Sequence, residues 1–197
     1  MRPICEPANN LIAVSPADCS FGHAYDIDHE SNIPATKIKQ THHYGNITQL
    51  IEGSQYAETF AGGTFVHYIL PPSAYHRYHS PVAGLVKESF LINGRVYMQS
   101  TWPTTSSGRG QHHHWLRVLP NQRSAHHRHD HQRSGSGGRC CSHPVGMAHV
   151  GSVNLTAVTG TQLLKGEEFG YFQFGGSDII VLFQPGVDPQ VECSRFY

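Results

Sequence analysis

The sequence has few charged residues and no excess of either sign. Among its 197 residues, Lys plus Arg number 14 and Asp plus Glu number 14, so the formal net charge is zero. Without a basic excess, nothing in the composition indicates a surface for nucleic acid or for steering to an anionic membrane. No stretch approaches the ~18 consecutive apolar residues of a membrane span. Residues 1–7 lack the apolar segment of a signal peptide. We therefore expect a cytoplasmic protein with at most peripheral membrane contact.

A disulfide framework is also absent from the pattern. The chain has five cysteines, none in a Cys-x-x-Cys pair: Cys5, Cys19, Cys140, Cys141 and Cys193. An odd and scattered set favours free thiols in a reducing compartment. The length is enough for one domain with a sizeable core.

Strand-like segments dominate what is present. Apolar, aromatic and β-branched residues alternate in several segments, which is typical of strands: residues 64–70, 82–90, 95–99 and 150–158. Asn93 and Gly94 separate two of these segments and predict a hairpin turn. Residues 46–57 have helical spacing with Asn46 as N-cap, and residues 73–79 suit a single helical turn. The expected fold class is α+β: a β-rich single domain, residues 1–197, with few short helices.

Residues 100–143 differ in character from the rest of the chain. They combine Ser/Gly-rich runs with eight of the sixteen histidines, which lie between His112 and His143. One interpretation is a metal-binding histidine tract, centred on residues 112–131. Another is a disordered insert, because so little apolar surface cannot offset the entropy lost on ordering.

A third interpretation is that residues 100–143 are translated out of frame. A histidine codon read from its second base encodes Thr, Ile or Met, and a cysteine codon read in the same way encodes Ala or Val. The shifted segment would then have a strand-forming composition. Resequencing the coding DNA decides between this hypothesis and the disordered insert.

Near the C-terminus, residues 175–177 read Gly-Gly-Ser between two strand-like runs. Glycine permits bends that a side chain would block, so the pattern predicts a tight turn that presents Ser177. By itself this motif fits a plain turn between strands. Two further segments stand beside it: Ser-Pro-Ala-Asp-Cys at residues 15–19 and Tyr-His-Arg-Tyr-His-Ser-Pro at residues 75–81.

Together, these segments resemble the phosphatidylserine decarboxylase family. The resemblance covers about residues 2–99 and 144–186 and is most specific over residues 60–81 and 165–183. It implies autocatalytic cleavage between Gly176 and Ser177, after which Ser177 becomes a pyruvoyl cofactor. It implies no metal.

The resemblance also assigns roles to four residues. Ser177 matches the self-cleavage serine, His79 the histidine that acts as base, and Asp18 the aspartate of the Pro-Ala-Asp motif. His76 matches a histidine near the substrate and is our candidate acid. The chemistry agrees, because a serine hydroxyl needs a base to attack the Gly176 carbonyl, and a carboxylate commonly orients such a histidine.

The implied reaction converts phosphatidylserine to phosphatidylethanolamine and carbon dioxide. A free aromatic amino acid such as tryptophan is the alternative substrate, and a non-catalytic metal-binding or degenerate family member is the alternative class. Asp178 stands where many members have Thr, which puts a carboxylate beside the pyruvoyl. The membrane-contacting helices that precede this region in many members are missing here, as expected for a truncated chain or a soluble branch. The cleaved β and α chains are expected to stay associated. A homodimer is the oligomeric state to test.

Overall fold

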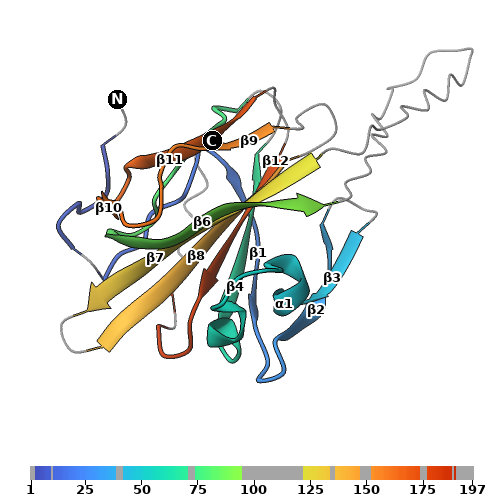
Figure 1. The fold of residues 1–197 in the computed structure, drawn as a ribbon. Coiled ribbons are helices and arrows are strands. Elements are labelled where there is room, and N and C mark those ends of the chain that lie inside the picture. Colours follow the sequence, from blue (N-terminus) through green and yellow to red (C-terminus); the bar gives the residue numbers. More distant parts are fainter. Residues whose placement is uncertain are drawn as a thin grey trace, which may run out of the picture.

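The computed structural model describes residues 3–9, 11–38, 42–70, 74–94, 122–133, 136–146, 152–173, 177–187 and 189. In this part of the chain the strands form three antiparallel sheets (Figure 1). The largest has seven strands in the order β1-β4-β12-β8-β7-β6-β10. A three-stranded sheet has the order β5-β11-β9, and β2 pairs with β3. The β-rich fold with few helices, expected from the sequence, is confirmed.

The strands and helices have the following bounds: β1 Ser20–Asp26, β2 Asn32–Ile38, β3 His42–Asn46, α1 Ile47–Leu50, the 3-10 helix η1 Ala57–Phe60, β4 Thr64–Leu70, β5 Arg77–His79, β6 Gly84–Gly94, β7 Gln122–Arg133, β8 Ser136–Gly146, β9 Ser152–Leu155, β10 Gln162–Leu163, β11 Glu168–Gln173 and β12 Ser177–Phe183.

Strand β12 lies in the interior of the large sheet, between β4 and β8 (Figure 1). Its residues 179–182 are Ile-Ile-Val-Leu, and all four are buried. A continuous apolar run suits a strand covered on both faces, because successive side chains point to opposite sides. The sequence of β12 therefore explains its central position.

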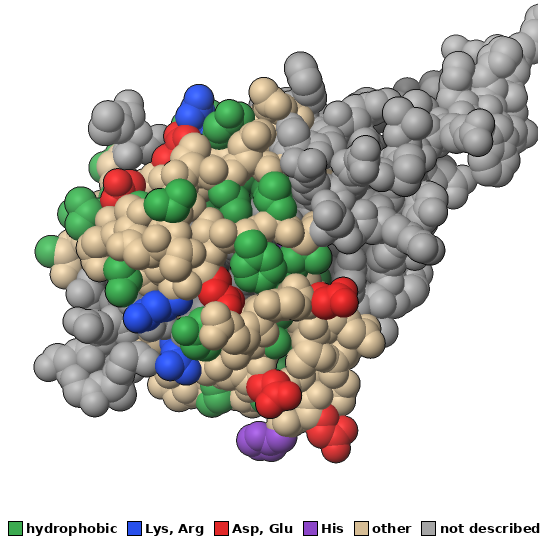
Figure 2. Space-filling model, viewed as in Figure 1, with side chains coloured by type: hydrophobic (Ala, Val, Ile, Leu, Met, Phe, Trp, Pro, Cys, Tyr) green, Lys and Arg blue, Asp and Glu red, His purple; other side chains and the backbone are tan. Residues whose placement is uncertain are grey.

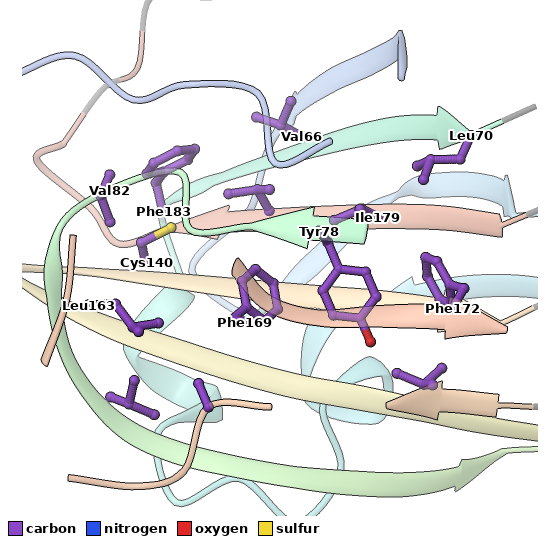
Figure 3. Close-up of a cluster of buried hydrophobic side chains, with 14 residues drawn as sticks. Val66, Leu70, Tyr78, Val82, Cys140, Leu163, Phe169, Phe172, Ile179 and Phe183 are labelled. Atoms are coloured by element: carbon purple, nitrogen blue, oxygen red, sulfur yellow. The ribbon is translucent and has the colours of Figure 1, made fainter. Parts of the chain in front are cut away.

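Two hydrophobic clusters cover the two faces of β12. On one face, Ile179 and Val181 pack with side chains of the three-stranded sheet, including Tyr78, Phe169 and Phe172 (Figure 3). On the other face, Ile180 and Leu182 pack against a cluster that includes residues of α1 and η1. The molecule thus has a small sheet on one side of the large sheet and two short helices on the other (Figure 1).

Some local expectations hold and others are wrong. Asn46 caps α1, since its side chain accepts a hydrogen bond from the Thr48 amide, but the helix ends at Leu50 rather than near residue 57. Asn93 and Gly94 do not form a turn, because β6 continues through them and pairs with β7. Residues 77–79 are strand β5 rather than part of a helical turn, because they pair with β11.

Of the three interpretations of residues 100–143, the disordered insert is not confirmed in the part that the structure describes. Residues 122–133 form β7, which contains the histidines of residues 126–131, and residues 136–146 form β8. Both Cys140 and Cys141 are buried, and residues 140–146 of β8 pair with the whole of β12. The rest of this segment, including His112–His114, lies outside the described residues.

Within the described ranges, no helix has the length and apolarity needed to span a bilayer. On the face shown in Figure 2, basic and acidic side chains are interspersed and are not separated by sign. This agrees with the zero formal charge of the sequence.

Candidate active site

Ser177 is the first residue of β12, and its backbone is held on both sides. It pairs with Leu70 at the end of β4 and with Gly146 at the end of β8. Residues 174–176, which include both glycines of the motif, lie outside the described residues and connect β11 to β12. The two strands that flank this connection therefore fix the region of the predicted cleavage.

His76 lies beside the strand that leads into this connection. Its carbonyl accepts a hydrogen bond of 2.8 Å from the amide of Phe172, near the end of β11. Its ring meets the Phe172 ring edge-on, with 6.2 Å between the centroids. The Nδ1 atom lies 2.6 Å from the carbonyl oxygen of Ala74. A carbonyl can only accept, so Nδ1 carries the proton and the lone pair is on Nε2.

His79 lies at the other end of β5, where it pairs with Glu168, the first residue of β11. Its Nδ1 atom is 2.9 Å from the carbonyl oxygen of Gly166. By the same argument Nδ1 donates, which leaves Nε2 as the basic nitrogen. The ring of Tyr75 stacks on His79 at 6.0 Å between centroids. The imidazole is thus fixed in one tautomer and one orientation.

The segment that carries Asp18 runs alongside His79. The amide of His79 donates to the carbonyl of Pro16 at 2.6 Å, and the amide of Val14 donates to the carbonyl of Pro81 at 2.9 Å. This backbone pairing places Asp18 two residues beyond the contact with His79. The structure therefore brings together two of the segments that the sequence singled out, residues 15–19 and 75–81.

The two histidines have different surroundings. His79 follows Arg77 on the outer face of β5, where Arg77 pairs with Glu168 at 2.7 Å. His76 packs on Phe172, whose ring belongs to the core between the sheets. The strand register places His76 nearer than His79 to the connection that contains Gly175 and Gly176. Whether His79 reaches the Ser177 hydroxyl stays a prediction.

The buried side chain of Lys165 binds the N-terminal segment next to the turn that contacts His79. The Nζ atom of Lys165 donates to three carbonyl oxygens: that of Glu6 at 2.6 Å, of Asn9 at 2.9 Å and of Ile12 at 3.1 Å. Three acceptors match the three donors of an ammonium group, which offsets its burial. Lys165 precedes Gly166, so one turn holds both the N-terminal segment and His79.

Sequence reasoning missed two features. The contact of the Gly166 carbonyl with His79 joins residues far apart in the chain, so no local sequence pattern indicates it. His67 lies within residues 60–81, and the resemblance assigns it no role. It is buried, and its Nε2 lies 3.4 Å from Oδ2 of Asp178, the residue after Ser177.

No cluster of three or more potential metal ligands occurs where side chains are described. The side chains of the histidines in β7 and the whole of residues 112–114 lie outside that set. The alternative of a histidine-tract metal site therefore falls on side chains outside the described set and stays a prediction.

Comparison with known proteins gives a family match over nearly the whole chain. The family model described as phosphatidylserine decarboxylase matches residues 1–195. Phosphatidylserine decarboxylase proenzyme 3 of Schizosaccharomyces pombe is 34% identical over 191 residues, which are 94% of this chain and 18% of the relative. The phosphatidylserine decarboxylase proenzyme of Chlamydia muridarum is 31% identical over 93% of this chain and 55% of the relative.

A third relative, the phosphatidylserine decarboxylase proenzyme of Halalkalibacterium halodurans, is 28% identical over 88% of this chain and 60% of the relative. The chain therefore spans between 18% and 60% of the length of these three curated relatives.

Proposed function

Because this chain belongs to the phosphatidylserine decarboxylase family, we propose that it is a self-processing, pyruvoyl-dependent carboxy-lyase acting on phosphatidylserine. One observation carries the proposal. Ser177 opens the central strand β12 after a three-residue connection from β11. Strand β11 pairs with β5, which ends at His79, and also bonds to His76, the residue just before β5. The printed names of the relatives support the substrate and the proenzyme character.

Maturation begins at the peptide bond between Gly176 and Ser177. His79, with its lone pair on Nε2, takes the proton of the serine hydroxyl, and the oxygen attacks the Gly176 carbonyl to give an ester. Removal of the α-proton of Ser177 then breaks the ester by β-elimination. The released chain ends at Gly176 as a carboxylate, and the dehydroalanine that remains hydrolyses to pyruvoyl and ammonia. General-base assistance of this kind accelerates a reaction by roughly 10²- to 10⁴-fold.

The site fits a pyruvoyl group at position 177. The backbone there is held by both neighbouring strands, and the next residue, Asp178, is buried. When present, a pyruvoyl group supplies an electron sink for the loss of carbon dioxide. His76 lies beside the end of β11. Its Nε2 would first take up the proton that the substrate's ammonium group loses, and His76 is then the candidate acid that returns a proton to the substrate carbon.

Asp18 is proposed to act on His79 from the adjacent segment. The backbone contact between Pro16 and His79 supports this role, because it holds the aspartate-bearing segment against β5. We infer that the two cleaved chains stay associated, since β11 and β12 lie on opposite sides of the cut and each remains paired with other strands.

The test uses the full chain and its Ser177→Ala variant. Intact mass should show a chain of residues 1–176 and a short chain whose blocked N-terminus reacts with a carbonyl reagent. The variant should stay uncut. Carbon dioxide release is then measured with phosphatidylserine vesicles and, separately, with free tryptophan. Release from the vesicles alone supports the proposal, release from tryptophan alone changes the substrate class, and an uncut wild-type chain overturns the proposed function.

A further inference from the structure

A buried histidine–carboxylate pair lies directly beyond the predicted cleavage site. Asp178 is the second residue of β12, and His67 is in the adjacent strand β4. Their side chains are 4% and 5% exposed, and Nε2 of His67 lies 3.4 Å from Oδ2 of Asp178. The proposed mechanism gives neither residue a role.

The pair belongs to the face of the large sheet away from His76. Along β12, Asp178 alternates with Ile179, which packs between the two sheets, while Ile180 lies in the cluster on the other face. His67 pairs with Ile180 in the strand register, so it is a diagonal neighbour of Asp178. The pair therefore does not share the His76 side of β12.

The described residues around the His67 imidazole and the Asp178 carboxylate offer these two groups few other polar partners. Among the described residues, His67 is the only basic side chain within 4 Å of the Asp178 carboxylate. Neither ring nitrogen of His67 has a hydrogen-bond partner within this set. The backbone of Gly22 in β1 packs against the ring, since a Cβ atom there would lie 3.2 Å from Nδ1. A buried carboxylate is costly without a partner, and the imidazole is the described basic group that lies close enough to offset that cost.

The position of the pair gives it a consequence for the cleaved protein. Before cleavage, position 177 is held by covalent bonds on both sides. Afterwards the bond to Gly176 is gone, and the group made from Ser177 is attached to the protein only through the amide nitrogen of Asp178. Whatever fixes Asp178 then fixes that group.

Resting on the proposed function, we propose that His67 and Asp178 are positioning residues that anchor the new N-terminus after self-cleavage. They hold the pyruvoyl group in place for decarboxylation and do not touch the substrate. Many members of the family have Thr at position 178. In this chain Asp178 takes that place, and His67 is its partner.

Three variants test the anchor: Asp178→Asn, His67→Gln and the double variant. Each should still be cut to completion, as read from intact mass. Before cleavage, the peptide bonds to Gly176 and to Asp178 both hold Ser177, so maturation does not depend on the pair. The kcat for decarboxylation should fall by about 10- to 100-fold, since displacement of a reacting group by about 1 Å can cost that much. The KM should stay within about twofold, and the double variant should be no worse than either single variant.

The matched control is Ile180→Val, a buried change on the same face of β12 that leaves the pair intact. It should lower the thermal midpoint while kcat stays at the wild-type value. Hydrogen exchange of the cleaved protein gives a second measure: amides at the start of β12 should exchange faster in the pair variants than in the control.

Two outcomes overturn different claims. If wild type is cut and active while the pair variants keep the wild-type kcat and exchange, the anchor is wrong and the proposed function stands. The anchor is also wrong if kcat falls as much in Ile180→Val as in the pair variants. An uncut wild-type chain overturns the proposed function and the anchor with it.

Discussion

The Nδ1 atom of His79 lies 2.9 Å from the carbonyl oxygen of Gly166, a contact between β5 and the turn that precedes β11. Because a carbonyl accepts only, the contact assigns the proton to Nδ1 and the lone pair to Nε2. The Gly166 carbonyl thus helps to orient the imidazole, and the role that the resemblance implies for the carboxylate of Asp18 on the same histidine stays a proposal. Asp18 reaches the same strand through its own segment, whose Pro16 carbonyl accepts from the His79 amide.

The first prediction concerns maturation. His79→Gln retains hydrogen-bonding capacity but removes the base, so we expect self-cleavage to slow by roughly 10²- to 10⁴-fold. Intact mass against time after synthesis measures the rate. His23→Gln, an exposed change on β1, is the control and should cleave at the wild-type rate. Wild-type cleavage in His79→Gln contradicts the assignment of the base.

The second prediction separates His76 from His79. His76→Gln should be cut normally, because the proposed base is His79, but decarboxylation should lose about 10²-fold or more in kcat through loss of the acid. The measurement is carbon dioxide release from phosphatidylserine vesicles by fully cleaved protein. If cleavage and decarboxylation fall together, His76 acts in maturation and the division of roles is wrong.

The sequence predicted the strands best where local pattern and burial coincide. Residues 64–70 alternate and form β4, and the apolar run of residues 179–182 lies in β12, where both faces are covered. Segments 15–19 and 75–81, which the resemblance singled out, lie side by side through the backbone contact of Pro16 with His79, and the roles of their residues stay predictions. These features depend on side-chain periodicity and on long motifs, both of which are visible in one chain.

The errors arose where tertiary pairing decides local structure. Asn93-Gly94 favours a turn by itself, yet β7 supplies a partner that keeps both residues in β6. The histidine-rich residues 126–131 lack apolar content, yet neighbouring strands satisfy their backbone groups. Two contacts join segments that are far apart in the chain: Gly166 with His79, and His67 with Asp178. Local sequence patterns cannot predict such contacts.

The third prediction concerns packing in the three-stranded sheet. The Tyr78 ring lies between Phe169 and Phe172 (Figure 3), and its hydroxyl donates to the carbonyl of Asn154 at 2.7 Å. A Cβ atom at Gly170 would lie 2.2 Å from the Tyr78 ring, so Gly170→Ala forces the ring or the strand to move. We expect the free energy of unfolding to fall by about 1–3 kcal/mol or more.

Denaturant unfolding measures the effect, with Gly45→Ala as the matched control. A Cβ atom at Gly45 would meet nothing within 4 Å, so that variant should stay within about 0.5 kcal/mol of wild type. Tyr78→Phe should cost about 0.5–1.5 kcal/mol through the lost hydrogen bond. Equal stability of the two alanine variants is inconsistent with this packing.

The fourth prediction concerns the N-terminal segment. Lys165→Met removes the ammonium that binds the carbonyls of Glu6, Asn9 and Ile12, and it leaves a side chain of similar length. Residues 3–14 should then open locally and become sensitive to protease, because hydrogen bonds to a charged group are each worth about 1.5–3 kcal/mol. Since Asp18 follows this segment, self-cleavage should slow as well. Limited proteolysis followed by mass spectrometry locates the opening.

Glu52→Gln, an exposed change of one charge after α1, is the control and should leave the N-terminal segment protected. Protection of residues 3–14 in Lys165→Met at the wild-type level means that the three carbonyl contacts do not hold the segment in solution.

The fifth prediction orders the thiols by reactivity. Only a thiolate alkylates readily, and burial raises the pKa of a thiol because it disfavours the charged form. Burial raises the pKa of Cys140 strongly and also raises the pKa of Cys19, whereas Cys5 is exposed. At about pH 8, and among the cysteines that the structure describes, a thiol-reactive amide should therefore label Cys5 first and Cys19 more slowly. Cys140 and Cys141, both buried in β8, should react only after unfolding.

Peptide-resolved mass spectrometry of native and guanidinium-treated protein measures the order of labelling. Fast native labelling of Cys140 or Cys141 means that the hydrophobic cluster around that thiol is open in solution, because these clusters bury the two side chains on opposite faces of the sheet.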